Sequence, residues 1–271
     1  MRGAYFLKSL ISAEAGLASY YPRIRRVSTR DSRIVLIACM PKSGSTFLST
    51  ALAGAIGYRH SYLACAYRNV EQELFVPKIL DTYGRGTVVQ QHLRANVPNL
   101  EVIRRFRIRT TVLVRDIMDV LVSLRDHLSN ERLDNIPSLY PPHAYREQPI
   151  EQQLDYVIDY FAPWLIQFYV SWARAQQESR TDLLFLDYGT CRADWTGALR
   201  RIADQHGLDV SAAELKQSVD RTTATNKTRM NKGVSGRGRD LLSADQVERV
   251  VRLTKVYPEV DFSPVLSTVS S

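Results

Sequence analysis

One lysine stands in a short polar turn that could bind an anion. Residues 41–47 read Pro-Lys-Ser-Gly-Ser-Thr-Phe; a β-branched apolar run, Ile34 to Ala38, precedes them and apolar residues at helical spacing follow. A strand, a polar turn and a helix present main-chain N–H groups to an anion, and Lys42 would add a full positive charge. Ser and Gly are also ordinary turn residues. We interpret the turn as a site for the 5′ end of a nucleotide.

Two further side chains with suitable chemistry follow apolar runs of the same kind. Gln91 and His92 follow a short strand predicted at 86–90, and Arg115 comes directly after a strand predicted at 110–114. Because ligands of parallel sheets bind beyond the carboxyl ends of the strands, we expect Lys42, His92 and Arg115 to share one site. Arginine suits bidentate contact with phosphate, and histidine suits a base near neutral pH. The three residues predict a site for a polyanion with a base beside it.

Strands alternate with helices along the chain, and this order predicts the elements that position those residues. We expect an α/β fold, a single domain whose central, mainly parallel sheet carries helices on both faces. A third core strand is predicted at 182–188, and residues 58–85 predict no element. Helices are predicted at 96–107, 119–127, 150–179 (with a kink or break at Pro163), 193–206, from Ser211 (capping box with Glu214) and from Ser243 (capping box with Gln246) to about Val256.

Length and charge limit the class of protein. A chain of 271 residues with 45% hydrophobic residues suits one domain, 1–271. Its net charge of +8 indicates an anionic partner, without choosing among nucleotide, nucleic acid and membrane. The usual signatures of nucleic-acid binding do not occur, so we expect no nucleic-acid partner.

Cysteine spacing and the first residues bear on the compartment. Cys39, Cys65 and Cys191 lie far apart without metal-ligand or C-x-x-C spacing, which predicts reduced thiols, no metal site and a cytoplasmic protein. Lys8 and Glu14 interrupt the first apolar run, and no span long enough to cross a membrane follows. We therefore expect residues 1–30 to form an N-terminal helical segment rather than a signal peptide.

Two segments have the composition of long loops. Residues 128–149 contain four prolines, which predicts a surface excursion that is either a substrate loop or a plain insertion. Residues 222–240 contain five basic residues and three glycines without apolar periodicity. This segment is either a solvated loop or a basic flap that covers a nucleotide.

On these residues the chain resembles the sulfotransferases that use 3′-phosphoadenosine 5′-phosphosulfate (PAPS), which transfer a sulfuryl group to an acceptor, usually a hydroxyl. Residues 41–47 resemble the family's 5′-phosphosulfate loop, P-K-S-G-T-T-W, and residues 115–123 resemble its 3′-phosphate segment, R-N-P-x-D-V-x-V-S. Residues 91–93 are similar to the T-H-L that carries the catalytic base. Tyr188 matches the tyrosine of an L-x-Y-E-D stretch, and residues 231–236 are similar to the R-K-G-x-x-G of the flap, with Asn231 in place of its arginine.

The resemblance implies a P-loop-like strand–loop–helix, PAPS as co-substrate and no metal. It implies that His92 is the base and that Lys42 stabilises the leaving group, with Glu71 or Glu73 as the alternative base. The residues it assigns to the nucleotide are Lys42, Ser43, Gly44, Ser45, Thr46, Phe47, Arg115, Ser123, Tyr188, Lys232 and Gly233. Arg229 or Arg237 could supply the charge that Asn231 lacks.

Other interpretations stay open at this point. A P-loop kinase or NTPase, transferring phosphate from ATP with magnesium, shares the strand–loop–helix, but Lys42 precedes Gly44 and the G-x-x-x-x-G-K-[ST] spacing is missing. A non-enzymatic nucleic-acid binder fits only the charge. The acceptor is expected to be a hydroxyl of a small molecule or carbohydrate. Candidate walls of its pocket are 58–80, 128–149 and the aromatic residues Tyr140, Tyr145, Trp164 and Phe168. The oligomeric state is open.

Overall fold

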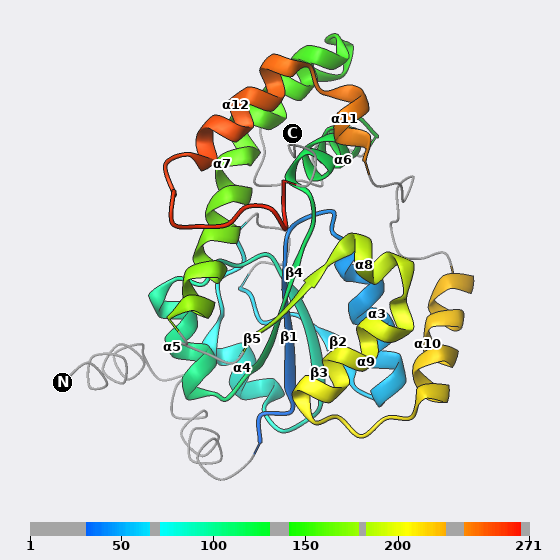
Figure 1. The fold of residues 1–271 in the computed structure, drawn as a ribbon. Coiled ribbons are helices and arrows are strands. Elements are labelled where there is room, and N and C mark those ends of the chain that lie inside the picture. Colours follow the sequence, from blue (N-terminus) through cyan, green and yellow to red (C-terminus); the bar gives the residue numbers. More distant parts are fainter. Residues whose placement is uncertain (1–30, 66–70, 131–140, 179–182, 226–235, 267–271) are drawn as a thin grey trace, which may run out of the picture.

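Five parallel strands form the centre of the fold (Figure 1). The computed structural model describes residues 31–65, 71–130, 141–178, 183–225 and 236–266. Within these, the sheet order is β2–β3–β1–β4–β5. The strands are β1 (Ile34–Cys39), β2 (Arg59–Ser61), β3 (Thr87–Gln91), β4 (Arg109–Val114) and β5 (Leu183–Asp187).

The central strand β1 is buried on both faces, as its β-branched sequence predicts. Ile34, Leu36 and Ala38 face one hydrophobic core, and the alternate residues Val35 and Ile37 face the other. Successive side chains of a strand point to opposite faces, so one short run of apolar residues contributes to both cores.

Helices cover both faces of the sheet (Figure 1). One face packs against α3 (Ser45–Ile56), α8 (Tyr188–Ala193), α9 (Trp195–His206) and α10 (Ala212–Ala224). The other packs against α4 (Val76–Thr82), α5 (Val97–Arg105), α6 (Ile117–Asn130) and α7 (Ile150–Gln177). The short α11 (Arg237–Leu241) contacts α6, α12 (Ala244–Thr254) contacts α7, and the 3-10 turn η3 spans Tyr145–Glu147.

Local signals in the sequence are confirmed where they concern strands and helix starts. The predicted core strands 34–38, 110–114 and 182–188 form β1, β4 and β5, and the short strand predicted at 86–90 is β3. Each lies within one residue of its predicted bounds. Both capping boxes form, with the Ser211 and Ser243 hydroxyls accepting from the N–H groups three residues on. Residues 58–85, which predicted nothing, contribute β2 and α4.

Of the kink or break predicted at Pro163, the structure excludes the break. Helix α7 continues through this residue from Ile150 to Gln177. Phe161 and Ala162 before it, and Leu165 after it, are buried in the core. Packing of this face compensates for the hydrogen bond that proline cannot donate.

The described ends of both predicted loop segments belong to packed elements. Helix α6 extends to Asn130, and Tyr145 is fully buried, so both ends of 128–149 belong to the packed domain. The segment 222–240 likewise begins inside α10 and ends inside α11. Residues 226–235, residues 131–140 with the candidate pocket residue Tyr140, and the predicted N-terminal segment 1–30 lie outside the described residues.

Candidate active site

The predicted site residues follow the carboxyl ends of neighbouring strands. The register pairs Ala38 of β1 with Gln91 of β3, and Cys39 of β1 with Leu113 of β4. His92 therefore lies on one side of the loop that follows β1, and Arg115 follows β4 on the other side. The structure brings Lys42, His92 and Arg115 together because their strands are adjacent and parallel.

The turn after β1 has a backbone shape suited to an anion. Lys42 and Gly44 both have left-handed φ angles, 60° and 77°, and the Ser43 hydroxyl donates to the Met40 carbonyl at 2.6 Å. Gly44 is the N-cap of α3, and no side chain caps this N-terminus. By contrast, Ser211 and Ser243 cap α10 and α12. The N–H groups of the first turn of α3 are thus directed at the turn, where a phosphate or sulfate oxygen can accept from them.

Aromatic residues pack against this turn at Gly44. A Cβ added at Gly44 would lie 2.8 Å from Cε2 of Tyr188 and 3.1 Å from Cη2 of Trp195. Phe47 is buried and packs on Trp195 with ring centroids 4.6 Å apart. The Phe47 side chain is therefore part of the hydrophobic core. No sequence motif indicated that Trp195 would contact this turn.

Arg115 connects three parts of the site. One guanidinium nitrogen donates to the Lys42 carbonyl at 2.8 Å, and the other contacts Oδ2 of Asp119 at 3.4 Å. The guanidinium lies over the Tyr188 ring, 4.4 Å from its centroid. The exposed fraction of Arg115 is 7%, so protein groups rather than water surround this cation. A buried, oriented arginine is well suited to a phosphate group.

Asp119 fastens the C-terminal end of the predicted flap to α6. Its carboxylate accepts from the Gly236 N–H and from the Gly238 N–H, both at 2.9 Å. A Cβ at Gly238 would lie 2.4 Å from Cβ of Met118, so the two backbones are in close contact. A pairing of Arg237 with Asp126 at 2.8 Å strengthens the attachment. The sequence motif contained Asp119, but its contacts with residues 236–238 could not be seen there.

Ser123 is buried on α6 between Asp119 and Asp126 in the sequence. It is four residues after Asp119, so the two side chains lie on the same face of the helix. Arg237, a predicted alternative source of charge, lies nearby through its pairing with Asp126. Lys232 and Gly233, with Arg229, lie outside the described residues.

A main-chain hydrogen bond sets the tautomer of the His92 imidazole. Its Nδ1 lies 2.9 Å from the carbonyl oxygen of Cys39, which can only accept, so Nδ1 carries the proton and Nε2 keeps a lone pair. Burial lowers the pKa of His92 below its ordinary value of 6.5, and the Lys42 charge adds to this decrease. The Cys39 carbonyl and the Glu71 carboxylate act in the opposite direction but do not reverse it. At neutral pH the imidazole is uncharged and can accept a proton.

The adjacent thiol of Cys39 is not a nucleophile. Its Sγ lies 3.4 Å from Nδ1 of His92, a spacing that a Cys–His pair would have. Cys39 is fully buried, however, and burial raises the pKa of this thiol to about 12. The thiol therefore stays protonated and packs as an apolar group.

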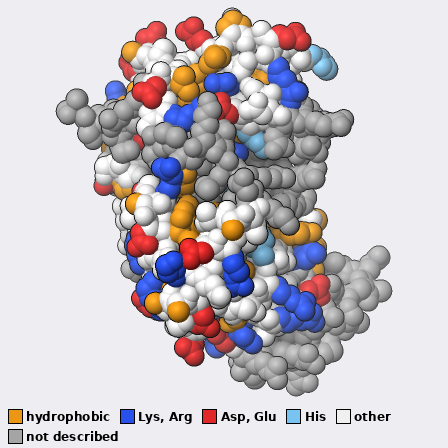
Figure 2. Space-filling view, turned by 90° about the vertical axis from the view of Figure 1, so that its right-hand side faces the viewer, with side chains coloured by type: hydrophobic (Ala, Val, Ile, Leu, Met, Phe, Trp, Pro, Cys, Tyr) orange, Lys and Arg blue, Asp and Glu red, His pale blue; other side chains and the backbone are white. Residues whose placement is uncertain are grey.

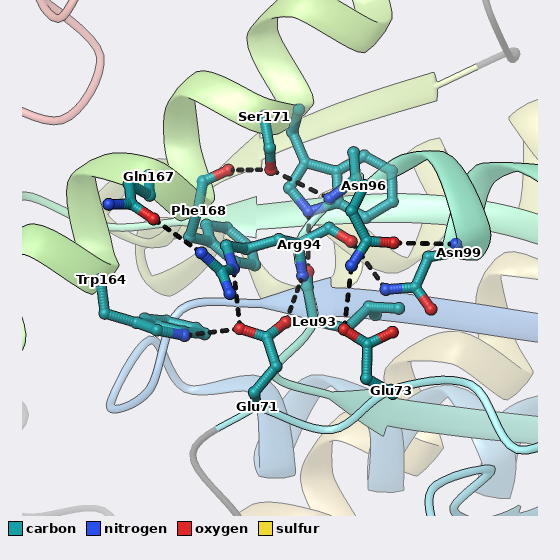
Figure 3. Close-up of polar contacts among 12 residues, drawn as sticks. Glu71, Glu73, Leu93, Arg94, Asn96, Asn99, Trp164, Gln167, Phe168 and Ser171 are labelled. Carbon is teal, nitrogen blue, oxygen red and sulfur yellow. Dashed lines mark hydrogen bonds and ion pairs between the residues drawn. The ribbon is translucent and has the colours of Figure 1, made fainter.

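The two predicted alternative bases already accept hydrogen bonds from other side chains (Figure 3). Glu71 accepts from the main-chain N–H and from Nε of Arg94, and from Nε1 of Trp164. Glu73 accepts from Nδ2 of Asn96 at 2.9 Å. These contacts favour His92 over either glutamate as the base.

Surface charge, helix composition and metal-ligand groups in the described part of the chain do not distinguish among the candidate reactions. In the part of the face that Figure 2 describes, Lys and Arg side chains are interspersed with Asp and Glu. None of the described helices is long and apolar enough to cross a membrane. Among the described residues, no group of three His, Cys, Asp or Glu is placed to hold a metal ion.

Comparison with known proteins gives a consistent result. A family model described as "Sulfotransferase domain" matches residues 32–248. No curated protein matches the sequence significantly. The crystal structure of mouse sulfotransferase SULT7A1 complexed with PAP is similar in fold, with a TM-score of 0.65, 16% identity, and coverage of 92% of this chain and 94% of that one. A structure of retinol dehydratase with retinol and PAP has a TM-score of 0.55, 15% identity, and coverage of 87% and 85%.

Proposed function

We propose that this chain, which belongs to the sulfotransferase family, transfers a sulfuryl group from PAPS to a hydroxyl of a small molecule or carbohydrate, with His92 as the base. Family membership confirms the prediction made from residues 41–47 and 115–123, and it removes the kinase or NTPase alternative. The single observation that carries the residue assignment is the 2.9 Å contact of His92 Nδ1 with the Cys39 carbonyl. This contact leaves Nε2 as the proton acceptor beside the Lys42 turn.

The residues present fit a nucleotide with two anionic ends. The uncapped N-terminus of α3 and Lys42 suit the 5′-phosphosulfate, and Arg115 with Ser123 suits the 3′-phosphate. PAP is the nucleotide bound in the structures of the mouse sulfotransferase and of retinol dehydratase. Here PAPS supplies the sulfuryl group as a substrate.

The reaction follows from the roles of two side chains. Nε2 of His92 takes the proton of the acceptor hydroxyl as its oxygen forms a bond to sulfur. The bond from sulfur to the phosphate oxygen of PAP breaks, and its electron pair stays on that oxygen. Lys42 and the N–H groups of the turn stabilise this charge. Positioning and electrostatics supply the catalysis.

The acceptor class rests on chemistry rather than on a pocket. A neutral histidine removes a proton from a hydroxyl but is not required by an acceptor that is already deprotonated. Retinol and androsterone are the small molecules bound in the retinol dehydratase structures. A cytoplasmic location remains part of the proposal; Cys39, Cys65 and Cys191 are all unpaired thiols, which suits a reducing compartment.

The proposal is tested by incubating the protein with PAPS and a panel of alcohols, phenols, sugars and amines, and identifying products by mass spectrometry. We expect a sulfated hydroxyl product from the wild type and little from His92→Ala. A thermal shift with PAP in the absence of magnesium should accompany it. Sulfated amines alone would overturn the acceptor class, and no sulfated product with any acceptor, together with no PAP shift, would overturn the function.

A further inference from the structure

The segment that carries His92 is held by residues outside the sheet. Strand β3 ends at Gln91, so its ladder with β1 does not include His92. Gln72 continues the pairing instead: its N–H donates to the His92 carbonyl, and its Oε1 accepts from the His92 N–H, both at 2.8 Å. Gln72 is buried, and Nε2 of Gln91 donates to its carbonyl at 2.8 Å. The position of His92 therefore depends on residue 72 as well as on β3.

Glu71 holds the same segment two residues further on (Figure 3). Its Oε1 accepts from the main-chain N–H of Arg94 at 3.0 Å, and its Oε2 accepts from Nε of Arg94 at 2.8 Å. Nε1 of Trp164 on α7 also donates to Oε2 at 2.8 Å. One carboxylate thus joins the chain after β3 to a helix that is distant in the sequence.

A row of side chains on α7 completes this attachment. Trp164, Gln167 and Ser171 are three and four residues apart, so they lie on one face of the helix. Gln167 accepts from Nη1 of Arg94 at 2.6 Å, and the Ser171 hydroxyl accepts from the Ala95 N–H at 2.9 Å. Figure 3 shows this face directed at residues 93–96. Main-chain and side-chain groups of the segment are both engaged.

We infer that Glu71 is a positioning residue for His92: through Arg94 and Trp164 its carboxylate fixes the segment that carries the base. The inference rests on the proposed function of His92. Three donors converge on the Glu71 carboxylate, so this glutamate serves as an acceptor of fixed geometry rather than as the proton acceptor itself. A small displacement of a catalytic group can greatly lower the reaction rate, so contacts that hold the segment of His92 in place support catalysis.

The charge of Glu71 acts on His92 as well. Among the described residues, the titratable groups that face His92 are the Cys39 thiol, Lys42 and Glu71; the thiol stays neutral. The Lys42 cation lowers the pKa of His92, and the Glu71 carboxylate raises it. Removing the Glu71 charge therefore lowers the pKa of His92 further. His92 would then be a weaker base, and it would become protonated only at lower pH.

Glu73→Gln provides a matched control. Glu73 is two residues from Glu71 in the same segment, but its carboxylate contacts Asn96 and is not among the groups that act on His92. Glu71→Gln keeps one oxygen acceptor and loses the charge, whereas Glu71→Ala loses both. Three quantities are compared in each variant: kcat with the first acceptor that yields product, PAP affinity by calorimetry, and the NMR titration midpoint of the His92 Hε1 signal.

We expect Glu71→Gln to lower kcat by about tenfold, to leave PAP affinity within about twofold, and to move the His92 midpoint to lower pH. Glu73→Gln should change none of these. An unchanged midpoint and kcat in Glu71→Gln, or equal changes in Glu73→Gln, would overturn the inference. The NMR titration needs no turnover, so it tests the Glu71–His92 relationship even if the wild type transfers no sulfuryl group, which would contradict only the proposed function.

If Glu71→Ala does not fold, the decision rests on Glu71→Gln and on Arg94→Lys. Lysine keeps the positive charge but cannot reproduce the paired contacts of the guanidinium with Glu71 and Gln167. A fall in kcat without a shift in PAP affinity is expected there too. Wild-type kcat in both variants would contradict a positioning role.

Discussion

The guanidinium of Arg115 donates a hydrogen bond to the main-chain carbonyl of Lys42 at 2.8 Å. These residues are far apart in the sequence, and each belongs to a different predicted anion-binding segment. The contact joins the turn after β1 to the start of α6. The segments proposed to bind the two ends of the nucleotide are therefore in direct contact with each other. The same guanidinium is buried and lies over the Tyr188 ring.

Replacing Arg115 should mainly weaken nucleotide binding. Arg115→Ala removes a buried cation, and a charged hydrogen bond contributes about 1.5–3 kcal/mol, so we expect the Kd for PAP to rise about 10- to 100-fold in calorimetry. Arg109 is the matched control, since it lies at the opposite end of the same strand and pairs with Asp31 at 2.8 Å. Arg109→Ala should bind PAP as the wild type does. Equal affinity of Arg115→Ala and the wild type would contradict the assignment.

Replacing His92 should affect turnover rather than nucleotide binding. General base catalysis contributes about 10²- to 10⁴-fold, so His92→Ala should lower kcat by that factor while PAP affinity stays within about twofold. Steady-state kinetics and calorimetry measure the two effects separately. His60 offers a control, because its ring contacts the Ser49 hydroxyl at 3.0 Å and it is on β2 at the sheet edge. Near-normal turnover in His92→Ala would rule out its role as the base.

The pH dependence should report the pKa of His92. Only the neutral imidazole can take a proton, so kcat/KM should be level near neutrality and fall as the pH drops through the pKa of His92. Burial and the Lys42 charge lower this pKa from 6.5, so the acid limb should lie below pH 6.5. The residual activity of His92→Ala should lack the limb. An acid limb above pH 6.5, or one that persists in that variant, would contradict the environment described for His92.

The two glycines that flank α3 distinguish the effect of backbone strain from the effect of side-chain contact. Gly44 and Gly57 both have left-handed φ angles, but a Cβ at Gly57 meets nothing within 4 Å, whereas one at Gly44 meets Tyr188 and Trp195. Gly57→Ala should destabilise the fold by about 1–2 kcal/mol through φ alone. Gly44→Ala should lower the Tm further and weaken PAP binding, because the turn must move away from Tyr188. Thermal denaturation with and without PAP checks both, and identical behaviour of the two variants would refute the packing explanation.

Asp119 should control the attachment of α11. Asp119→Ala removes the acceptor of the Gly236 and Gly238 N–H groups, so amide hydrogen exchange in residues 236–241 should accelerate at least about tenfold. PAP affinity should fall with it, because Arg115 also loses its contact with Asp119. Asp240, exposed on α11, is the control; Asp240→Ala should leave exchange of the Gly236 and Gly238 amides unchanged. Unaltered exchange in Asp119→Ala would show that α11 is held by other contacts.

Features that depend on neighbouring residues could be predicted from the sequence. The buried strand, the polar turn and the helix around Lys42 are encoded within one short stretch, and the capping boxes at Ser211 and Ser243 need only residues three apart. The convergence of His92 and Arg115 on the turn followed from one rule, because parallel strands end at the same edge. The sequence by itself therefore determined the class of fold, the elements of the site and the family.

Only the tertiary structure decided which side chains hold that site in place. Glu71 meets Arg94 and Trp164, and Asp119 meets Gly236 and Gly238, across separations that carry no periodic signal. Phe47 entered the core because Trp195 of a distant helix packs on it. Burial and hydrogen bonding among distant elements depend on how the helices pack on the sheet. No local sequence pattern specifies this packing. For the same reason α7 continues through Pro163, where local propensity favours a break but packing on the core compensates.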